Sequence, residues 1–348
     1  MALNPEFKLD QSSLMTPKLI RKHKAAPGDA VDAAELKART GQLALVLDLA
    51  YQAFGRQEPA GRIVEALAGR LHQLRRQVAP ALWHELIPLA QQHRVAKYLL
   101  QDPFTRWSSE KPRGYSGDAT LLDIYYKHRS ADEIVASSSE LGREIFAYTS
   151  EAASSVAGRE RRSILARTVD ETADQVDDAE ILAIACGHLR EAELSKALSE
   201  KRLKRWVGLD QDPLSVGTVN RDLAGTPVEA IDGSVRGILR RAYNLGTFDL
   251  VYASGLYDYL PDAVGVRLLQ RAMEMVKPDG EFLFANFSDE ITTDGYMETF
   301  MDWPLILRSA DDMWSIINAA LDRNRVDAEV YYGSNRNIVY GRIRKRGS

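Results

Sequence analysis

The hydrophobic pattern changes near residue 180, and this change constrains the fold more than any other feature. Upstream, apolar residues recur at helical spacing, as in Leu43, Val46, Leu47, Ala50 and Phe54. Downstream, short apolar runs that stop at a glycine or an aspartate alternate with helix-like segments. Such alternation is typical of βαβ units and a parallel sheet. We therefore expect a helical N-terminal domain over residues 1–170 and an α/β domain over residues 171–348.

The expected elements follow from this pattern. Helices are predicted over Gly61–Val78 and Pro80–Leu100, after Asp118, and over Ala131–Ala157, with no useful strand-like alternation before about residue 180. The predicted strands are Ile181–Cys186, Trp206–Leu209, Val228–Ile231, Phe248–Ala253 and Glu281–Ala285. A helix is expected over Glu191–Lys201, and a closing antiparallel hairpin over Glu329–Tyr332 and Asn337–Tyr340.

Three strands end at residues that suit a nucleoside. Ligands of open α/β sheets lie outside the carboxyl ends of the strands. Gly187 there allows a tight turn, and Asp210, 23 positions later, can accept both hydroxyls of a ribose. Asp232 can accept a hydrogen bond from an exocyclic amine such as that of adenine. Asp210 can equally be a turn or helix-capping residue, and NAD is disfavoured because the loop lacks the further glycines of the dinucleotide fingerprint.

The same segments carry a resemblance. Glu180–Glu191, Val207–Asp210, Ile231–Ser234, Phe248–Val251 and Val276–Leu283 together resemble the class I methyltransferases that depend on S-adenosylmethionine (SAM). Val276–Leu283 looks like the helix-to-strand turn of that family. The resemblance implies a Rossmann-like, mostly parallel seven-stranded sheet with an antiparallel last strand, beneath a helical cap. It implies SAM as ligand, bound by Cys186, Gly187, His188, Asp210, Gln211, Asp232, Gly233, Ser254 and Gly255.

The resemblance also implies a role for several of these residues. It implies that Gly187 lines the methionine moiety, that Asp210 holds the ribose, and that Asp232 with Gly233 flanks the adenine. The chain departs from the family in its glycine-poor first loop, where His188 and Arg190 stand at positions that are often small. That departure concerns the detailed pose of the ligand rather than the class of protein.

A narrower resemblance involves both halves of the chain. Pro112–Asp118, Arg159–Arg162, Ser254–Leu260 and Ala285–Ser288 are similar to a bacterial subgroup. This subgroup includes proteins of 3-hydroxypalmitic acid methyl ester biosynthesis and azetidine-2-carboxylate synthases of secondary metabolism. It implies either methyl transfer, with a carboxylate or similar acceptor expected, or a cyclisation of SAM that releases 5′-methylthioadenosine. The motifs favour neither chemistry strongly, and methyl transfer is the principal expectation.

Four residues are candidates for the reaction itself: Tyr115, Asp118, Tyr257 and Asn286. Tyr115 and Asp118 follow a flexible glycine-containing turn, and Asp118 can equally cap the next helix. Aromatic rings such as that of Tyr257 attract a sulfonium cation, although such rings are as often core residues. Asn286 can bind an amino-acid group or a substrate carboxylate. The arginines of Arg159–Arg162 could pair with a carboxylate, but a solvated helix face is the favoured interpretation.

Composition narrows the class of protein. A net charge of −4 over 348 residues argues against a broad nucleic-acid surface. Ser254–Tyr259 also differs from the Asn/Asp-Pro-Pro-Tyr/Phe motif of base-amine methylation. The single cysteine, Cys186, excludes an internal disulfide and a cysteine-based zinc cluster, and the histidines lack metal-ligand spacing.

These observations lead to one principal expectation and several open points. No apolar run is long enough to span a bilayer, and the first 30 residues are polar with a basic patch. We therefore expect a cytoplasmic enzyme that acts on a small molecule without metal, nucleic acid or membrane. The alternative from another class is a non-catalytic SAM-binding regulatory protein. Oligomeric state, and whether residues 1–30 form a lid, stay open.

Overall fold

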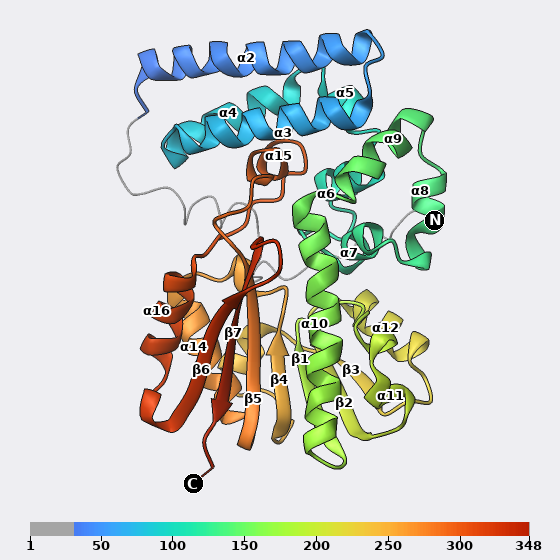
Figure 1. The fold of residues 1–348 in the computed structure, drawn as a ribbon, viewed down its shortest axis with the longest axis vertical. Helices are drawn as coiled ribbons and strands as arrows, with labels where there is room; N and C mark the ends of the chain where they lie inside the picture. The colour runs from blue at the N-terminus through green and yellow to red at the C-terminus, as the bar shows by residue number, and fades with distance from the viewer. Residues whose placement is uncertain (1–30, 348) are drawn as a thin grey trace. The chain divides into compact units, whose positions relative to one another are not determined.

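The computed structural model describes residues 31–347, which divide into two compact units (Figure 1). The first holds the described residues up to Val156 together with Ile291–Leu305, and the second holds Ala157–Glu290 and the chain from Ile306 onward. The boundary expected at residue 170 falls within helix α10 (Ala153–Gln175), which starts in the first unit and continues into the second. Residues 1–30, for which the question of a lid was left open, lie outside the described residues.

The first unit is helical, as the spacing predicts. Its larger helices are α2 (Ala33–Gly55), α3 (Ala60–Arg76), α4 (Pro80–Gln92), α6 (Pro103–Glu110), α7 (Ala119–Tyr126) and α9 (Glu140–Thr149). Shorter ones are α5 (Ala96–Leu99), α8 (Asp132–Ala136) and α15 (Asp294–Thr299). In α2 the buried side chains include Leu43, Leu47, Ala50 and Phe54, which confirms the predicted apolar face.

Two expected helices are interrupted. The helix predicted over Pro80–Leu100 ends at Gln92, because His93 is extended (φ −68°, ψ 141°) and its Nδ1 accepts a hydrogen bond from the amide of Val95. The segment Ala131–Ala157, predicted to be helical, is divided as well, since the hydroxyl of Ser139 caps a new helix, α9, by accepting from the amide of Gly142.

Helix α15 comes from the second half of the chain but packs in the helical unit. Gly295 lies so close to α3 that an added Cβ would meet the Leu71 carbonyl carbon at 2.5 Å. Two buried carboxylates fasten the helix there. Asp294 pairs with His72 and Arg75, and Glu298 pairs with Arg75 and accepts from Trp83 Nε1 at 2.7 Å. The helical unit therefore depends on a segment more than 200 positions downstream of its core helices.

The second unit contains the predicted sheet. Its strands are β1 (Ala179–Ile184), β2 (Leu203–Asp210), β3 (Val228–Asp232), β4 (Phe248–Ala253), β5 (Val276–Phe287), β6 (Val326–Tyr332) and β7 (Ile338–Lys345). The seven strands lie in the order β3-β2-β1-β4-β5-β7-β6. Strands β1 to β5 pair in parallel, and β7 is antiparallel to both β5 and β6. The expected sheet with its reversed last strand is confirmed.

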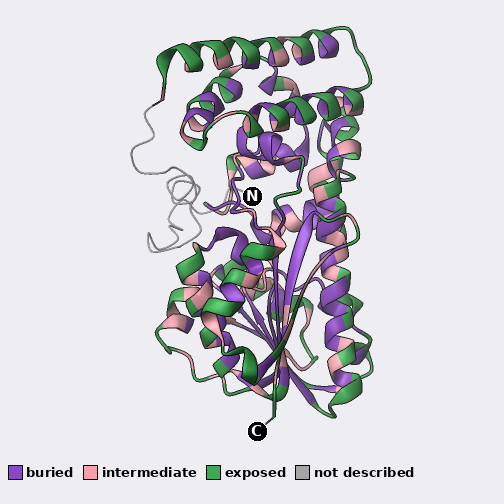
Figure 2. Cartoon of the chain, turned by 60° about the vertical axis from the view of Figure 1, so that its left-hand side comes forward, coloured by how far each residue is buried: buried purple, intermediate pink, exposed green. Residues whose placement is uncertain are grey.

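The order of strands places a switch point in the centre of the sheet. From β1 the chain moves outward to β2 and β3, then returns to β4 on the other side of β1. Both β1 and β4 are buried along their whole length, as the continuous apolar runs predict (Figure 2). Ligand sites of open α/β sheets form outside the carboxyl ends of such neighbouring strands.

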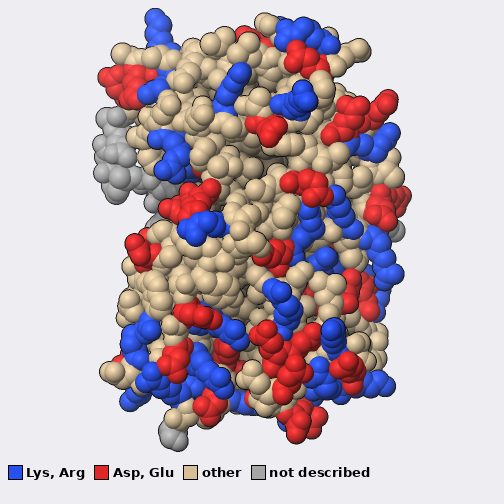
Figure 3. Space-filling model, in the orientation of Figure 1, with Lys and Arg blue, Asp and Glu red and all other residues tan. Residues whose placement is uncertain are grey.

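Helices cover the sheet. Helix α10 runs along one face (Figure 1), and α12 (Pro213–Asp222) packs on β2 and β3. Helices α13 (Val235–Leu239), α14 (Asp262–Glu274) and α16 (Ala310–Ala320) pack side by side, α14 in the middle. On the face drawn in Figure 3, acidic and basic side chains are interspersed. This agrees with the small net charge.

Two local predictions are corrected here. The helix expected over Glu191–Lys201 is broken into a 3₁₀ turn, Ala192–Leu194, and α11 (Lys196–Ser199). The break occurs because Ser195 is extended and its hydroxyl donates to Asp170 of α10 at 2.7 Å. The expected turn Val276–Leu283 is part of β5, where the pairing with β4 shifts register and Asp279 takes a left-handed conformation (φ 60°).

Candidate ligand site at the carboxyl edge of the sheet

The loop after β1 has an unusual backbone. Ala185, Gly187 and Leu189 all have positive φ angles, of 55°, 54° and 49°. Only glycine adopts this region without cost, so each of the other two residues stores roughly 1 kcal/mol or more. The loop is fixed to β2, because the amide of Cys186 donates to the carbonyl of Leu209 at 3.2 Å. Strain held in this way is typical of functional loops.

Asp210 ends β2 and joins three loops. Its Oδ2 accepts from the amide of Gly187 at 2.8 Å, and its Oδ1 accepts from the amide of Asp212 at 2.9 Å. Its carbonyl accepts from the amide of Gly233 at 2.8 Å. Burial raises the pKa of the carboxyl to about 6. Since each carboxylate oxygen has two acceptor positions, the pair can still receive two further hydroxyl donors.

Asp232 and Gly233 stand directly beside Asp210. Asp210 and Asp232 are partners in the β2–β3 register, and Asp232 is exposed. A Cβ at Gly233 would lie 2.7 Å from Leu209 Cδ1, so a larger residue in this turn would have to displace the Leu209 side chain. The edge thus combines a carboxylate held by backbone amides with an exposed carboxylate on the next strand.

The other residues predicted around this loop have distinct surroundings. Cys186 packs against β2, where a Cβ at Gly208 would meet its Sγ at 2.8 Å, and burial raises the pKa of its thiol well above the usual range. A thiol of that kind is a packing group rather than a nucleophile. His188 is 9% exposed, and Gln211, which follows Asp210, is partly exposed.

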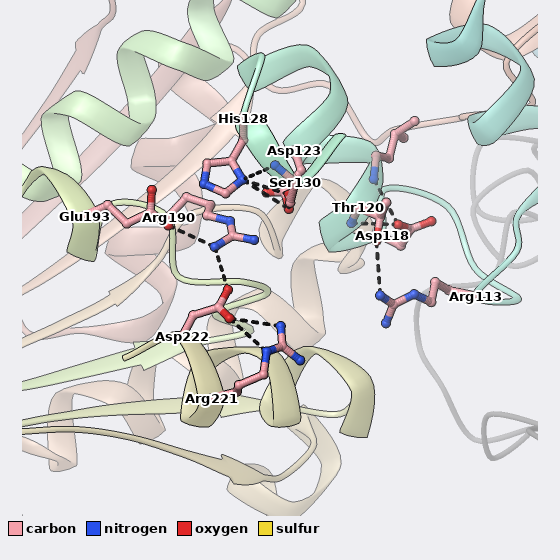
Figure 4. Close-up of polar contacts among 11 residues, drawn as sticks. Arg113, Asp118, Thr120, Asp123, His128, Ser130, Arg190, Glu193, Arg221 and Asp222 are labelled. Carbon is pink, nitrogen blue, oxygen red and sulfur yellow. Dashed lines mark hydrogen bonds and ion pairs between the residues drawn. The ribbon is translucent and has the colours of Figure 1, made fainter. Parts of the chain in front are cut away.

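Contacts of Arg190 hold the glycine-poor loop after β1 in place. Its side chain is buried, and its Nη1 contacts Glu193 at 2.9 Å and Asp222 of α12 at 3.1 Å (Figure 4). Asp222 also pairs with Arg221. These contacts connect the loop after β1 to the helix after β2. Side-chain ion pairs therefore fix the conformation of this loop without further glycines.

The segment after β4 is fixed by an arginine from α10. Arg161 Nη1 donates to the carbonyl of Ser254 at 2.8 Å, and a Cβ at Gly255 would lie 3.8 Å from Arg161 Nη2. Arg161 is 3% exposed. The favoured interpretation of this arginine as part of a solvated face is therefore wrong, because the helix turns it inward toward the end of β4.

Glu191 and Tyr252 form a second buried contact at the same place. The hydroxyl of Tyr252, in β4, donates to Glu191 Oε1 at 2.6 Å. Burial raises the pKa of Glu191, and the charges of Arg161 and Arg162 oppose that effect. Sequence reasoning missed this pairing of residues 61 positions apart. The one available signal was that Glu191 ends the loop that contains Gly187.

Tyr257 and Asn286 are bonded within the sheet unit. Tyr257 is fully buried, packs on Phe284 with ring centroids 4.5 Å apart, and donates to the carbonyl of Gly265. The Asn286 amide donates to the carbonyls of Phe287 and Ile306, and its Oδ1 accepts from Arg308 Nη1 at 2.6 Å. These contacts support packing and structural bonding for both residues, and their part in a reaction stays a prediction.

Tyr115 and Asp118 belong to the helical unit, and the cluster at the sheet edge is built without them. Asp118 caps α7 by accepting from the amides of Thr120 and Leu121 at 2.9 and 3.0 Å, and it also accepts from Trp107 Nε1 (the Asp118–Thr120 contact is drawn in Figure 4). The capping alternative is thus observed. Tyr115 is 8% exposed in the turn before it. A catalytic role for either residue stays a prediction.

Two findings concern metal binding and membrane-spanning helices. Among residues 31–347, no group of three or more His, Cys, Asp or Glu side chains is arranged to hold a metal ion. Within the same residues, no helix combines the length and the apolar content that crossing a membrane requires.

Comparison with known proteins places the fold. No protein-family model matches the sequence, and no curated protein matches it. A solved structure described as a possible exported protein from Bordetella parapertussis aligns over 91% of this chain and 100% of its own, with 16% identity and a TM-score of 0.54.

Lower-scoring matches are methyltransferases. The N-methyltransferase NodS from Bradyrhizobium japonicum, in complex with S-adenosylhomocysteine, covers 64% of this chain and 99% of its own at 16% identity and a TM-score of 0.40. Magnesium protoporphyrin IX methyltransferase from Synechocystis, with bound SAM, covers 66% and 97% at 11% identity and a TM-score of 0.40. The seven-stranded, mostly parallel sheet with its antiparallel last strand is the expected one, so the sheet unit has the class I methyltransferase fold.

Proposed function

We propose that this protein binds SAM at the carboxyl edge of its sheet and transfers the methyl group to a small molecule. The observation that carries the proposal is the adjacent pair Asp210 and Asp232, with Gly187 bonded to the first of them. Asp210 would hold the ribose hydroxyls, and the exposed Asp232 would accept from the adenine amine. Because Gly233 has no side chain, its backbone would approach the base closely.

A carboxylate is the acceptor that we propose. When bound, SAM supplies an electrophilic methyl group, which a carboxylate oxygen attacks as the carbon–sulfur bond breaks, giving a methyl ester and S-adenosylhomocysteine. Carboxylic acids are ionised near neutral pH, so the protein need not remove a proton. Its contribution is alignment and exclusion of water.

A second candidate reaction is favoured by the buried carboxylate of Glu191. In the cyclisation, the α-amine of SAM would lose a proton, attack its own γ-carbon and release 5′-methylthioadenosine, leaving azetidine-2-carboxylate. The amine must first be deprotonated, and the pKa of an α-amine is ordinarily about 7.7–8.0. Glu191, held by Tyr252, is an acceptor for that proton at the methionine end of the proposed site. A silent SAM-binding protein is the remaining alternative.

One experiment separates these functions. The purified protein is incubated with SAM alone and with SAM plus a panel of fatty and amino acids, and nucleoside products are identified by mass spectrometry. Methyl transfer predicts S-adenosylhomocysteine only when an acceptor is present. Methylthioadenosine with a cyclic imino acid from SAM alone would establish the cyclase instead. Binding without turnover in any mixture would leave the regulatory alternative.

A further inference from the structure

Helix α2 carries exposed leucines on the face that is turned away from its own unit. Its inner face, which includes Leu43 and Leu47, packs on α3 and α4, and α2 is the outermost of these three helices (Figure 1). Yet Leu45 is 61% exposed, and Leu49, one turn later, is 40% exposed. A helix with a single buried face usually carries polar or charged residues on the opposite one. The outer face of α2 therefore has the character of a face that is covered.

A third exposed leucine comes from α4. Arg39 of α2 contacts Gln77, shortly before α4 begins. Asp48 contacts His93, directly after the last residue of α4, so the two helices run in the same direction. Leu89, one turn before His93, therefore lies beside the middle turns of α2, and it is 41% exposed. Single exposed leucines are ordinary on a protein surface, but three on adjacent helices form an apolar patch, which is typical of an interface.

The outer face of α2 has small residues in its first half and larger ones in its second. Uncharged, exposed residues follow one another along it at helical spacing: Ala34, Ala38, Gly41, Leu45, Leu49 and Gln52. A glycine inside a helix costs roughly 0.5–1 kcal/mol relative to alanine. A Cβ at Gly41 would meet nothing within 4 Å, so packing within the described chain does not require this glycine. Close approach by another helix would require it.

A second copy of α2, running in the opposite direction, matches this order of sizes. In a two-fold pair centred near residue 43, Leu45 of one copy faces Gly41 of the other, and Leu49 faces Ala38. The large residues of each helix then fill the space above the small residues of the other copy, as close packing of helices requires. A parallel pair would place Gly41 against Gly41 and leave a void there.

The charges beside this face also match in an antiparallel pair. Lys37 and Asp48 border the same side of the face, one in each half of the helix, and Lys37 is exposed. The two-fold axis keeps these sides together, so Lys37 of one copy approaches Asp48 of the other. Asp48 is 41% exposed although it pairs with Arg94, and a carboxylate has acceptor positions for a second cation. Such exposed pairs add little energy but favour one register over others.

We propose that the outer face of α2, with Leu89 of α4 beside it, is the interface of a two-fold symmetric homodimer. The proposal does not depend on the function proposed for the sheet unit. The face from residue 34 to residue 52 is about 27 Å long, at about 1.5 Å per residue. One helix pair of that length lies near the lower size limit of specific interfaces, roughly 1,000 Å² in total, so the dimer should be reversible.

Sedimentation velocity of the full-length protein, from about 1 to about 100 µM, tests the interface. The natural protein should pass from monomer to dimer in this range. Leu45→Glu places a charge in the apolar contact and should weaken association about tenfold or more. Gly41→Leu should weaken it about as strongly, because the new side chain occupies the space that Leu45 of the other copy fills. Within one chain the change has open space and improves helix propensity, so the protein should still fold.

Two further variants make the test specific. Gly69→Leu, at an exposed position of α3 where an added Cβ also meets nothing within 4 Å, is the matched control and should leave association unchanged. The double variant Gly41→Leu/Leu45→Gly exchanges a large and a small residue, so each leucine again faces a glycine of the other copy. It should recover association to within about threefold of the natural protein. Thermal unfolding of each variant checks that the fold is intact.

Several outcomes would overturn the proposal. Association that is unchanged in both Leu45→Glu and Gly41→Leu would mean that the copies meet through another surface. Stronger association in Gly41→Leu would contradict the antiparallel arrangement. A natural protein that stays monomeric at about 100 µM would exclude a second copy as the occupant. In that case, a lower melting temperature of Leu45→Glu would indicate that another part of the same chain covers the face, and an unchanged one that water does.

Discussion

The amide of Gly187 donates a hydrogen bond to Oδ2 of Asp210 at 2.8 Å, joining the loop after β1 to the end of β2. The Asp210 carboxylate therefore has two roles. It holds a strained loop in place, and it presents its remaining acceptor positions at the edge of the sheet. The proposed function would therefore couple ligand binding to loop geometry through the side chain of Asp210, and several predictions depend on that coupling.

Asp210→Asn should weaken SAM binding about tenfold to a hundredfold, as expected for loss of charged hydrogen bonds worth roughly 1.5–3 kcal/mol. The Asp210 carboxylate accepts from a backbone N–H on each of its two oxygens. The asparagine side chain has only one acceptor oxygen, so one of these backbone N–H groups would face the side-chain NH₂, which is also a donor. Calorimetry measures the affinity. Asp232→Asn should reduce it less, because an amide oxygen can still accept from an adenine amine. Equal affinity in Asp210→Asn and the natural protein would refute the ribose assignment.

SAM affinity should depend on pH through Asp210. Its folded pKa of about 6 lies above the ordinary value of 3.8, so the carboxyl is protonated in the folded protein below about pH 6. Only the ionised form accepts from both ribose hydroxyls while it attracts the sulfonium cation. Affinity should therefore rise with pH and level off above about 7. Titrations from pH 5 to pH 8 test this, and an affinity that is flat or falls with pH contradicts it.

The same pKa has the opposite consequence for stability. The unfolded carboxyl ionises near 3.8 and the folded one near 6, so the folded state holds more protons between those values. The contribution of Asp210 to stability is therefore greatest at low pH and decreases as pH rises through this window. The stability difference between the natural protein and Asp210→Asn, measured by urea unfolding, should shift in that direction from pH 4 to pH 7.

Glu180 should stabilise the opposite edge of the sheet. It pairs with Arg205 at 2.8 Å, with Lys204 and with Lys277, and these partners lower the pKa of its carboxyl to about 2 despite the opposing effect of burial. A lowered pKa gives stability that is complete above about pH 4.5 and is lost as pH falls toward 2. Because the partners are partly exposed, we expect Glu180→Gln to cost about 1–2 kcal/mol at pH 7.

Urea unfolding at several pH values measures this contribution. The difference between the natural protein and Glu180→Gln should shrink toward zero near pH 2 to 3. Glu229→Gln, an exposed change on β3, is the matched control and should have no effect at either pH. A Glu180→Gln cost that persists unchanged at low pH would mean that packing, rather than charge, is responsible.

Arg75 should be the residue on which the docking of α15 depends most. It contacts Asp294 at 2.8 Å and Glu298 at 2.9 Å, and both carboxylates are 5% exposed or less. Arg75→Met removes the cation that these two buried carboxylates share. We expect a loss of about 3 kcal/mol or more. Thermal unfolding should detect it, while Arg70→Met, an exposed change on α3, should leave the melting temperature in place.

Much of the sheet unit could be predicted from the sequence, because its apolar runs and their terminal residues reflect local rules. A strand buried on both faces needs a continuous apolar run, as Phe248–Ala253 shows. A ligand-binding edge needs glycine or a carboxylate where a strand ends, and Gly187, Asp210 and Asp232 are found there. The capping role of Asp118 also followed from its place before a helix.

Interruptions within helices were less predictable. Ser195 breaks an otherwise helical segment because Asp170, 25 positions earlier in the chain, accepts its hydroxyl. The bonds of Asn286 to Arg308 and to two carbonyls could not be predicted either, and its part in ligand binding stays a prediction. In both cases the partner is distant in sequence, and no periodicity identifies it.

The sequence by itself determined the class of fold, the residues Gly187, Asp210 and Asp232 at the ends of its first three strands, and that its single cysteine forms no internal disulfide. Only the tertiary structure decided that Arg161 is turned inward, that Glu191 meets Tyr252, and that α15 joins the helical unit through Asp294 and Glu298. The physical reason is that the spacing of apolar residues indicates only which face of a helix or strand is buried. The partner of a buried charge depends on which distant segments of the chain pack together, and many such pairings are compatible with the same spacing of apolar residues.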